Sequence, residues 1–440
     1  MSSVKAKSHT AWIAELFRSS ARALEDRKIG IEIERIAMWP DKTSFSYSDK
    51  AHPGASTLLK NLSKKHIWPI ITNTEGNPLG LTSTHGKVSL EPGSQVELST
   101  DPLKDIFQVQ KEVDAFEKKV TSITDEWGLL WLTLGSDPIH AVKEIELIPS
   151  ERYGIMTEYF EKRSRLGTSM MRRTASVQIN LDYTSEKEAI EMLRASLLAS
   201  PISYALFGNS PFIDGKPSGY VSYRHQIWLE TDPNRTGMFQ EAFAKDFSFE
   251  KLAEYLWNEP LMFVQDKKKQ YVAADGQTLY DIEAGKLEGV VLDDTNQWNA
   301  IRQLFTDSRL KPGYVEIRSV DNLSPADRYA CTAFWVGLMY DETARKLCFE
   351  LLGQYDDKQR RELSLAIAKD GLLAKSSIPV LEICKKLFEA SKASLVNRGL
   401  GEEAFLKPLE TIIDSRMNPG QKALKLWNGD LSKTLTDNRF

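Results

Sequence analysis

KIGIEIERIAM, residues 28–38, alternates apolar and polar residues without a break. Residues two apart in a β-strand share a face, so this stretch predicts a strand with Ile29, Ile31 and Ile33 on one side. The other side carries Glu32 and Glu34. A sheet strand with two neighbouring carboxylates on its polar face is the feature around which the rest of the chain can be interpreted.

Three further stretches repeat this pattern: SQVELS (94–99), TASVQINLDY (174–183) and GYVEIRSVD (313–321). Their polar faces carry the following charged and amide residues: Gln95 and Glu97; Gln178, Asn180 and Asp182; Glu316 and Arg318. Because these stretches are spread along the chain up to residue 321, we expect them to share one sheet.

Carboxylates dominate these polar faces, and Glu91 and Glu97 flank the turn residues Pro92-Gly93. A solvated sheet face explains any one such strand, but solvated faces usually mix Lys, Thr and Ser with acids. Carboxylates gathered on one face repel each other, so they take up protons or bind cations. Oxygen-rich sites of this kind suit Mg²⁺ shared with nucleotide phosphates. The sequence therefore predicts a Mg²⁺–phosphate platform, with the Pro92-Gly93 turn directing Glu91 and Glu97 to one place.

Arginines are the candidates for fixed positive charge beside this platform. Arg173, Arg224, Arg235 and Arg318 each offer a planar fork that matches a carboxylate or phosphate, although a surface ion pair also explains each one taken singly. Arg318 is the strongest candidate because it shares a strand face with Glu316. The nucleotide motif G-x-x-x-x-G-K-[ST] and the zinc motif H-E-x-x-H are both absent from the chain.

Charge and cysteine content bear on other functional classes. The formal net charge is −4, without a clustered basic excess, which argues against nucleic-acid binding. No stretch approaches about 18 apolar residues, and the N-terminal residues lack an apolar signal-peptide core, so we expect no membrane association and a cytoplasmic location. Cys331, Cys348 and Cys384 lie in apolar, helix-like stretches and are predicted to be buried, reduced thiols.

The remaining hydrophobic spacing is mostly helical. It predicts helices over 8–27, 103–125, 186–200, 324–346, 358–372 and 377–398. A buried strand is predicted over 127–135 and a loop over 208–219, while Gly399-Leu400-Gly401 predicts a helix stop. Since neither a repeat nor a linker is evident, we expect a single α+β domain, residues 1–440, with a mostly helical flank over 324–440.

Nine stretches, in this order along the chain, resemble the plant and proteobacterial type of glutamate–cysteine ligase. They are GIEIER, SLEPGSQVELS, ERYGIM, MMRRTASVQINLDY, ALFGNSPFIDGKPSG, RHQIW, DPNRTGM, RLKPGYVEIRSVD and AFWVGLMYD, from residue 30 to about residue 341. The resemblance implies a carboxylate–amine ligase of the glutamine-synthetase type, with a curved, mainly antiparallel sheet, an active site on its concave face, and helices outside. It further implies ATP and roughly two or three Mg²⁺ ions, which join L-glutamate to L-cysteine through γ-glutamyl phosphate.

The resemblance also implies roles for individual residues. The metal ligands would be Glu32, Glu34, Glu91, Glu97, Gln178 and Glu316. ATP would contact Gln178, Asn180 and Arg318. The substrate-binding residues would be Arg173, Arg224, Arg235, Tyr220 and Trp228. The catalytic residues would be Arg318, Glu316 and Glu34.

The sequence departs from the plant pattern at two points. Tyr329 occupies the position of a regulatory cysteine, and NLSPADR after Asp321 lacks the Gly and Trp of the plant version. Thiol–disulfide control is therefore unsupported, and we expect a monomer or weak homodimer. Three alternatives stay open: a γ-glutamyl ligase that uses another amine or serves another thiol pathway, a kinase that releases the acyl phosphate, and a non-catalytic binding relative.

Overall fold

A computed structural model of the chain describes residues 2–431. The strands are β1 (Ile29–Met38), β2 (Ile70–Thr72), β3 (Pro78–Ser83), β4 (Gly86–Leu90), β5 (Val96–Thr100), β6 (Leu130–Leu132), β7 (Val177–Asp182), β8 (Phe212–Ile213), β9 (Lys216–Pro217), β10 (Thr236–Gly237), β11 (Phe263–Gln265), β12 (Tyr271–Ala273), β13 (Phe305–Thr306), β14 (Ser308–Lys311) and β15 (Tyr314–Ile317). The α-helices are α1 (Ser2–Ser19), α2 (Ala55–His66), α3 (Ile106–Trp127), α4 (Glu151–Arg163), α5 (Gly167–Arg173), α6 (Glu186–Phe207), α7 (Tyr223–Leu229), α8 (Phe249–Asn258), α9 (Leu279–Glu283), α10 (Asp294–Arg302), α11 (Pro325–Met339), α12 (Glu342–Leu352), α13 (Asp357–Asp370), α14 (Val380–Arg398), α15 (Lys407–Ser415) and α16 (Pro419–Leu426).

One nine-stranded sheet organises the molecule. Its order is β14-β15-β7-β1-β5-β4-β3-β2, with β6 also paired to β1, and every pairing in it is antiparallel. The four alternating stretches therefore do share one sheet, and the predicted α+β class with a mainly antiparallel sheet is confirmed. The concave shape expected for the active-site face stays a prediction, as does the single-domain organisation.

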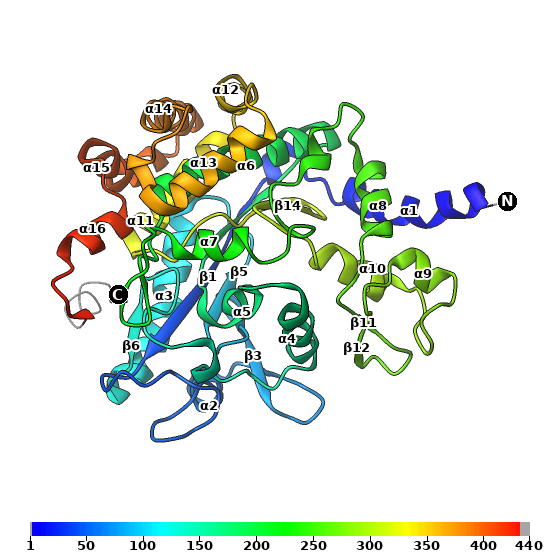
Figure 1. The fold of residues 1–440 in the computed structure, drawn as a ribbon, viewed down its shortest axis with the longest axis horizontal. Helices are drawn as coiled ribbons and strands as arrows, with labels where there is room; N and C mark the ends of the chain where they lie inside the picture. The colour runs from blue at the N-terminus through cyan, green and yellow to red at the C-terminus, as the bar shows by residue number, and fades with distance from the viewer. Residues whose placement is uncertain (1, 432–440) are drawn as a thin grey trace.

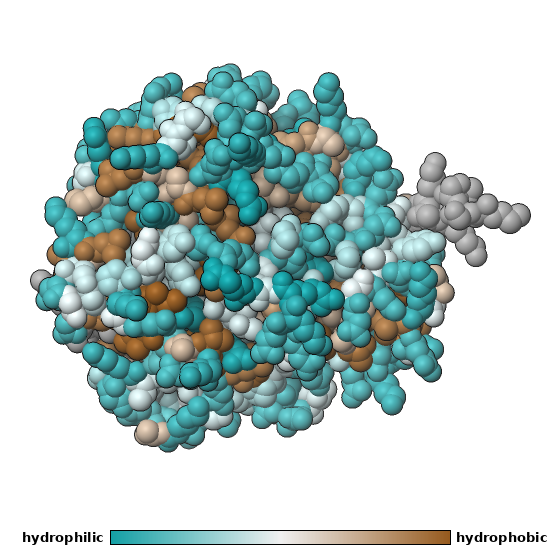
Figure 2. Space-filling model, in the orientation of Figure 1, coloured by the Kyte–Doolittle hydropathy of each residue, from teal (hydrophilic) through white to brown (hydrophobic). Residues whose placement is uncertain are grey.

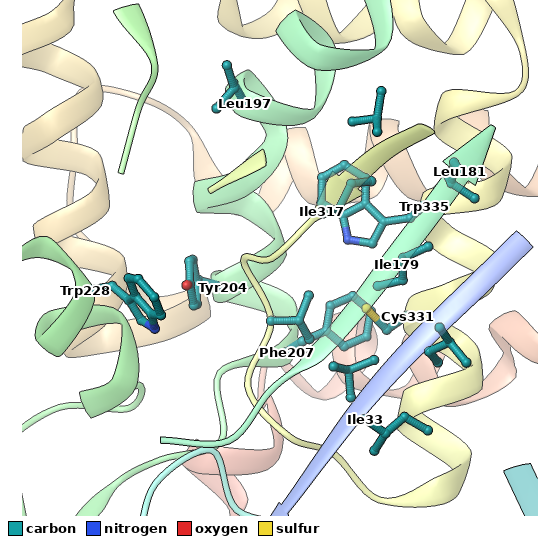
Figure 3. Packing of buried hydrophobic residues seen from close by; sticks show 14 of the residues in the cluster. Ile33, Ile179, Leu181, Leu197, Tyr204, Phe207, Trp228, Ile317, Cys331 and Trp335 are labelled. Carbon is teal, nitrogen blue, oxygen red and sulfur yellow. The ribbon is translucent and has the colours of Figure 1, made fainter. Parts of the chain in front are cut away.

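The apolar face of the sheet carries the hydrophobic core. Ile33, Ile179 and Ile317, from β1, β7 and β15, are fully buried beside Trp335 and Cys331 of α11 (Figure 3). Helices α3, α6 and α11 pack on this face. In Figure 1 the C-terminal helices α12–α15 form a further layer beyond α6 and α11. Burial of these isoleucines, at roughly 25 cal/mol per Å² of apolar surface, holds the sheet against the helices.

Helices α4, α5 and α7 lie on the opposite, polar face, and Figure 1 shows α5 and α7 in front of β1 and β5. The outer surface in Figure 2 is largely hydrophilic, with small apolar patches between the charged side chains. Among residues 2–431, no helix has the length and hydropathy needed to span a membrane.

The N-terminal helix is shorter than predicted. It ends at Ser19, where the hydroxyls of Ser19 and Ser20 bond to carbonyls one turn back, and the backbone N–H of Arg22 bonds to the carbonyl of Tyr183 instead. Leu24, expected on the buried face, is 67% exposed. Local side-chain hydrogen bonds compete with the helix here, which hydrophobic spacing does not register.

Three other boundaries differ from the sequence prediction. The strand expected over 127–135 covers only Leu130–Leu132, because α3 continues to Trp127 and ends on Gly128 in the left-handed region. The helix expected over 324–346 is two helices, since Asp341 caps the start of α12. Helix α6 runs through Pro201 to Phe207, where burial on all sides outweighs the hydrogen bond that proline cannot make. The stop at Gly399 is confirmed.

Candidate active site

A cavity of about 340 Å³ lies over the polar face of the sheet. Strands β1, β4, β5, β7 and β14 form its floor, and helices α4, α5, α7 and α10 supply its walls. Its lining residues that titrate are Glu32, Glu34, Glu91, Glu97, Lys87, Arg152, Tyr153, Arg224, Arg302, Arg309, Lys311 and Arg318. Acids and bases from segments distant in sequence thus meet in one space.

Four carboxylates occupy the β1–β5 side of this cavity. Glu34 of β1 is directly opposite Glu97 of β5, and Glu32 is opposite Gln178 of β7. Hydroxyls and amides hold them: Ser89 and Ser99 donate to Glu97, Ser176 and Gln178 to Glu34, Asn180 to Glu32, and Tyr153 to Glu91. Among residues 2–431, none of the four forms an ion pair within 4.0 Å.

Burial and mutual repulsion make these carboxylates unusually basic. Desolvation, followed by the charges of Glu91 and Glu34, raises the pKa of Glu97 to about 8. Desolvation, followed by the charge of Glu34, raises the pKa of Glu91 to about 7. Desolvation, followed by the charges of Glu316 and Glu97, raises the pKa of Glu32 to about 7. Desolvation also raises the pKa of Glu34, although Arg224 and Arg318 oppose it. A group of acids that resists ionisation in this way is suited to receive cations.

The turn between Glu91 and Gln95 brings Glu91 and Glu97 into the cavity. The N–H of Ser94 bonds to the carbonyl of Glu91, and Ser94 has φ of 69°, so the chain reverses within a few residues. The hairpin also packs tightly on α5, because a Cβ added at Gly93 would lie 2.3 Å from the carbonyl oxygen of Arg172. The interpretation of Pro92-Gly93 as a device that aims both acids at one place agrees with this geometry.

Glu316 pairs with three basic side chains and is not among the described residues that line the cavity. Arg309 of β14 grips its two oxygens at 2.7 and 3.0 Å, and Lys311 is 3.7 Å away. Arg318 also contacts Glu316, and its Nη1 donates to Gln178 Oε1 at 2.7 Å. Burial alone would raise the pKa of Glu316, but these three cations outweigh it and lower that pKa well below its ordinary value.

Arg318 is fixed by aromatic rings as well as by charges. Its guanidinium carbon lies 5.6 Å from the ring centre of Trp228 and 5.8 Å from that of Phe305. The Nε of Arg318 and the indole Nε1 of Trp228 are buried, without a hydrogen-bond partner among the described residues. Such donors at a cavity wall are ready to bind an anionic ligand.

Arg224 reaches the same wall from α7. Its Nη2 donates to the carbonyl of Arg318 at 3.2 Å, and its Nη1 lies 3.8 Å from Asp321. The fully buried Asp321 accepts hydrogen bonds from Ser210 and from Ser222, which caps the N-terminus of α7. Asp321 thereby ties α7, with its cavity residues, to the end of the β15 segment.

Other predicted site residues lie elsewhere. Arg173, Arg235, Tyr220 and Asn180 are not among the described residues that line the cavity. Arg173 bonds to the carbonyl of Asp137 and to Asp214, and Arg235 pairs with Asp232. Asn180 bonds to Glu32 from the neighbouring strand, which places it beside the carboxylates. The substrate and nucleotide roles of these four residues stay predictions.

Several cavity residues escaped the sequence interpretation. Arg309 and Lys311 precede Pro312-Gly313 and alternate on β14, so the spacing argument used for Glu316 would have put them on the same face. Arg152 and Tyr153, at the start of α4, gave no such signal, because only tertiary packing brings a helix over the sheet. Met156, Met170, Met171, Phe263 and Phe305 were missed for the same reason.

The donor set fits divalent metal, but the carboxylates do not form a ready-made cage. Among residues 2–431, no three His, Cys, Asp or Glu side chains converge closely enough to hold an ion. Each carboxylate instead accepts a hydrogen bond from a neighbouring hydroxyl or amide group, as described above. Four buried carboxylates and the amide of Gln178 around one cavity are nonetheless the oxygen ligands that Mg²⁺ takes. We therefore count the metal-binding chemistry as compatible with this site.

The arrangement has a known structural counterpart. The fold matches a crystal structure of glutamate–cysteine ligase from Francisella tularensis in complex with AMP, with a TM-score of 0.57, 13% identity, and coverage of 94% of this chain and 87% of that one. At that identity the likeness concerns the fold. The antiparallel sheet and its covering helices therefore have the fold of that ligase structure.

Sequence comparison narrows the class to a family. Residues 28–437 match the family described as Glutamate-cysteine ligase family 2(GCS2). The chloroplastic glutamate–cysteine ligase of Medicago truncatula is 35% identical over 421 residues, covering 95% of this chain and 82% of the relative. Ligase B of Oryza sativa subsp. japonica is 34% identical over 413 residues, covering 93% and 82%. The chain belongs to glutamate–cysteine ligase family 2, and the prediction of an ATP-dependent ligase is confirmed.

Proposed function

We propose that this protein joins the γ-carboxylate of L-glutamate to the amine of L-cysteine, with ATP, to give γ-glutamylcysteine, ADP and phosphate, the first step of glutathione biosynthesis. The observation that carries the proposal is a cavity in which four carboxylates meet a group of arginines and two lysines. Family membership and relatives named for this reaction support the choice of substrates.

The reaction has two steps, phosphorylation of glutamate and attack by the amine. An oxygen of the glutamate γ-carboxylate attacks the γ-phosphorus of ATP, and the bond to the bridging oxygen of ADP breaks. The cysteine nitrogen then attacks the carbonyl carbon of γ-glutamyl phosphate, phosphate leaves with the bonding electrons, and the nitrogen loses a proton. The acyl phosphate removes the need for a protein nucleophile, so no cysteine of the chain takes part.

Two sets of residues divide this work. Glu32, Glu34, Glu91 and Glu97, with Gln178, would hold Mg²⁺, which withdraws charge from the phosphoryl group and the attacking carboxylate. Arg318 stabilises the transferring phosphoryl group, since its guanidinium is immobilised by Trp228 and Phe305 before substrate arrives. Arg224, anchored by Asp321, offers a fork to a substrate carboxylate.

The cellular setting is also part of the proposal. We place the protein in the cytoplasm, supported by three buried thiols of which none is in a disulfide. Substrates are glutamate, cysteine and ATP, and we expect a monomer or weak homodimer without nucleic-acid or membrane partners. Cell fractionation tests the location, and light scattering of the purified protein tests the oligomeric state.

ADP release tests the reaction. Purified protein with ATP, Mg²⁺ and glutamate should release ADP only when an amine is added, and cysteine should give the highest kcat/KM in a panel of amino acids. A higher value for another amine would identify a different γ-glutamyl ligase. Amine-independent release would identify a kinase, and nucleotide binding without turnover would identify a binding relative.

A further inference from the structure

Lys311 is a buried lysine with few partners, and burial, followed by the charge of Arg309, lowers the pKa of its ammonium to about 7. The residue is only 9% exposed, yet its ammonium makes no hydrogen bond among the described residues. Its nearest acidic partner is Glu316, with 3.7 Å between Nζ and Oε2. A buried charge is costly unless it is paired and hydrogen-bonded, so an ammonium in this condition calls for a further partner.

Glu316 does not need Lys311 for its own neutralisation. Both oxygens of Glu316 are held by Arg309, whose Nη1 also donates to the carbonyl of Arg302 at 2.9 Å, and Arg318 contacts the same carboxylate. Arg309 is thus committed to protein partners, whereas Lys311 keeps its three donors available. The side chain lines the cavity, where a ligand can reach it.

The position of Lys311 in the sheet indicates the kind of ligand that it contacts. Strand β14 is the edge of the sheet next to β15, whereas the four carboxylates lie on the other side of β7, on β1, on β5 and in the β4–β5 turn. The cavity therefore has a basic end, lined by Arg302, Arg309, Lys311 and Arg318, and an acidic side on which Lys87 of β4 and Arg152 of α4 accompany the four carboxylates. A polyanion is the ligand that an excess of cations at one end selects.

We infer that Lys311 is a nucleotide-binding residue whose ammonium contacts the phosphates that ADP retains, while Arg318, nearer the carboxylates, faces the phosphoryl group that is transferred. The inference rests on the proposed function for the identity of the nucleotide. It assigns to Lys311 a role in holding ATP and ADP alike, and none in holding glutamate or cysteine.

Calorimetric titration of ADP in the presence of Mg²⁺, without glutamate or cysteine, tests the role. Lys311→Met should raise the Kd for ADP by about tenfold or more, the scale of one charge-assisted hydrogen bond. In steady-state assays the KM for ATP should rise similarly, with the KM values for glutamate and cysteine within twofold of wild type. Lys311→Gln, which keeps a donor of similar reach, should be less impaired, and it replaces Lys311→Met should that variant not fold.

Lys87→Met is the matched control, because Lys87 is an exposed lysine that lines the same cavity from β4. A smaller effect of Lys87→Met than of Lys311→Met supports a direct contact. If both variants raise the Kd for ADP equally, Lys311 contributes only to the overall positive potential of the cavity and makes no direct contact. An unchanged Kd for ADP in Lys311→Met would overturn the role. Wild-type protein that binds neither ADP nor ATP would instead refute the proposed function.

Discussion

Glu34 and Glu97 lie directly opposite each other across β1 and β5, and like charges in directly opposite positions destabilise a sheet. The next residue on β1, Arg35, points to the other face and pairs with Glu117, which also pairs with Arg328. The chain therefore neutralises the buried charge on its structural face but leaves four acids of the cavity face, Glu32, Glu34, Glu91 and Glu97, without an ion pair within 4.0 Å among the described residues. We take this contrast as the mark of a site that binds cations rather than of a network that stabilises the fold.

Arg318 provides a prediction at the scale of one residue. If it only balances charge, Arg318→Lys should keep most of the activity. Because the guanidinium is planar, lies between Trp228 and Phe305, and bonds to Gln178, we expect lysine to be a poor substitute. Steady-state kinetics should show kcat lowered by roughly 100-fold or more, the scale of one lost transition-state donor, with the KM for cysteine little changed.

The control for this substitution is Arg22→Lys, because the Arg22 side chain is 58% exposed and is not among the described residues that line the cavity. It should leave kcat unchanged. A kcat for folded Arg318→Lys within threefold of wild type would mean that Arg318 only balances charge.

At the scale of elements, the β4–β5 hairpin depends on a close approach to α5. Gly93→Ala would place a methyl group 2.3 Å from the backbone oxygen of Arg172, and this backbone oxygen cannot rotate away as a side chain would. We expect a loss of about 1–3 kcal/mol in the free energy of unfolding, as for other overpacked sites, and a fall in activity because Glu91 and Glu97 move with the hairpin. Urea unfolding and kinetics measure the two effects.

Gly154→Ala is the matched comparison for the hairpin prediction. Gly154 lies inside α4, and nothing is within 4 Å of an added Cβ. Alanine there should stabilise the protein by roughly 0.5–1 kcal/mol, because glycine is the poorer helix former. Equal effects of the two substitutions would show that the hairpin tolerates displacement from α5.

The C-terminal helices carry the thiols. Cys331, Cys348 and Cys384, on α11, α12 and α14, are fully buried, and burial raises the pKa of Cys348 to about 12. We expect a thiol reagent such as DTNB to leave the native protein unmodified over minutes and to modify all three thiols in denaturant. Activity should be the same with and without reductant. Rapid modification of the native protein, or reversible activation by reductant, would reveal redox control.

At the scale of the whole molecule, the sheet separates charge. Its β14–β15 edge supplies Arg309, Lys311 and Arg318, while β1 and β5 supply Glu32, Glu34 and Glu97. The polyphosphate and the metal of an ATP-dependent reaction are opposite charges that meet at the reacting phosphorus. This sheet presents basic side chains at one edge and acidic side chains on its inner strands. It can therefore orient the polyphosphate and the metal without a conformational change.

This separation makes metal-free stability depend on pH. The folded-state pKa values of Glu97, Glu91 and Glu32, about 8, 7 and 7, exceed the ordinary value of 4.5. The folded protein therefore binds protons more tightly than the unfolded chain between these values, and its free energy of unfolding falls as pH rises from about 4.5 to about 8. Mg²⁺ should offset the loss, so the Tm difference between Mg²⁺ and EDTA should be larger at pH 8 than at pH 5.5.

Glu97→Gln isolates the main contributor to this pH dependence. In EDTA the variant should be more stable than wild type at pH 8, where it removes a forced charge, and about equal at pH 5.5, where Glu97 is protonated. Its Mg²⁺ stabilisation should also be reduced. A Tm gain from Mg²⁺ that is independent of pH, in wild type and variant alike, would separate these carboxylates from metal binding.

Much of the site could be predicted from period-two spacing alone. Alternation in residues 28–38 and in the three other strands correctly placed Glu32, Glu34, Glu97, Gln178 and Arg318 on one face, since side chains of a strand point alternately to its two sides. The buried thiols were likewise predictable, from apolar neighbours. Boundaries such as the end of α1 and the break before α12 were not, because caps and local hydrogen bonds decide them.

Only the tertiary structure decided which charges meet. Strand order is not a local property, so the sequence could not reveal that Arg309 grips Glu316 or that Lys311 shares a cavity with Glu97. The sequence also could not show that Arg235 forms an ion pair with Asp232 instead of lining the cavity. Local spacing determines the face on which a side chain lies, because the backbone fixes it, whereas its partners depend on how distant strands and helices pack.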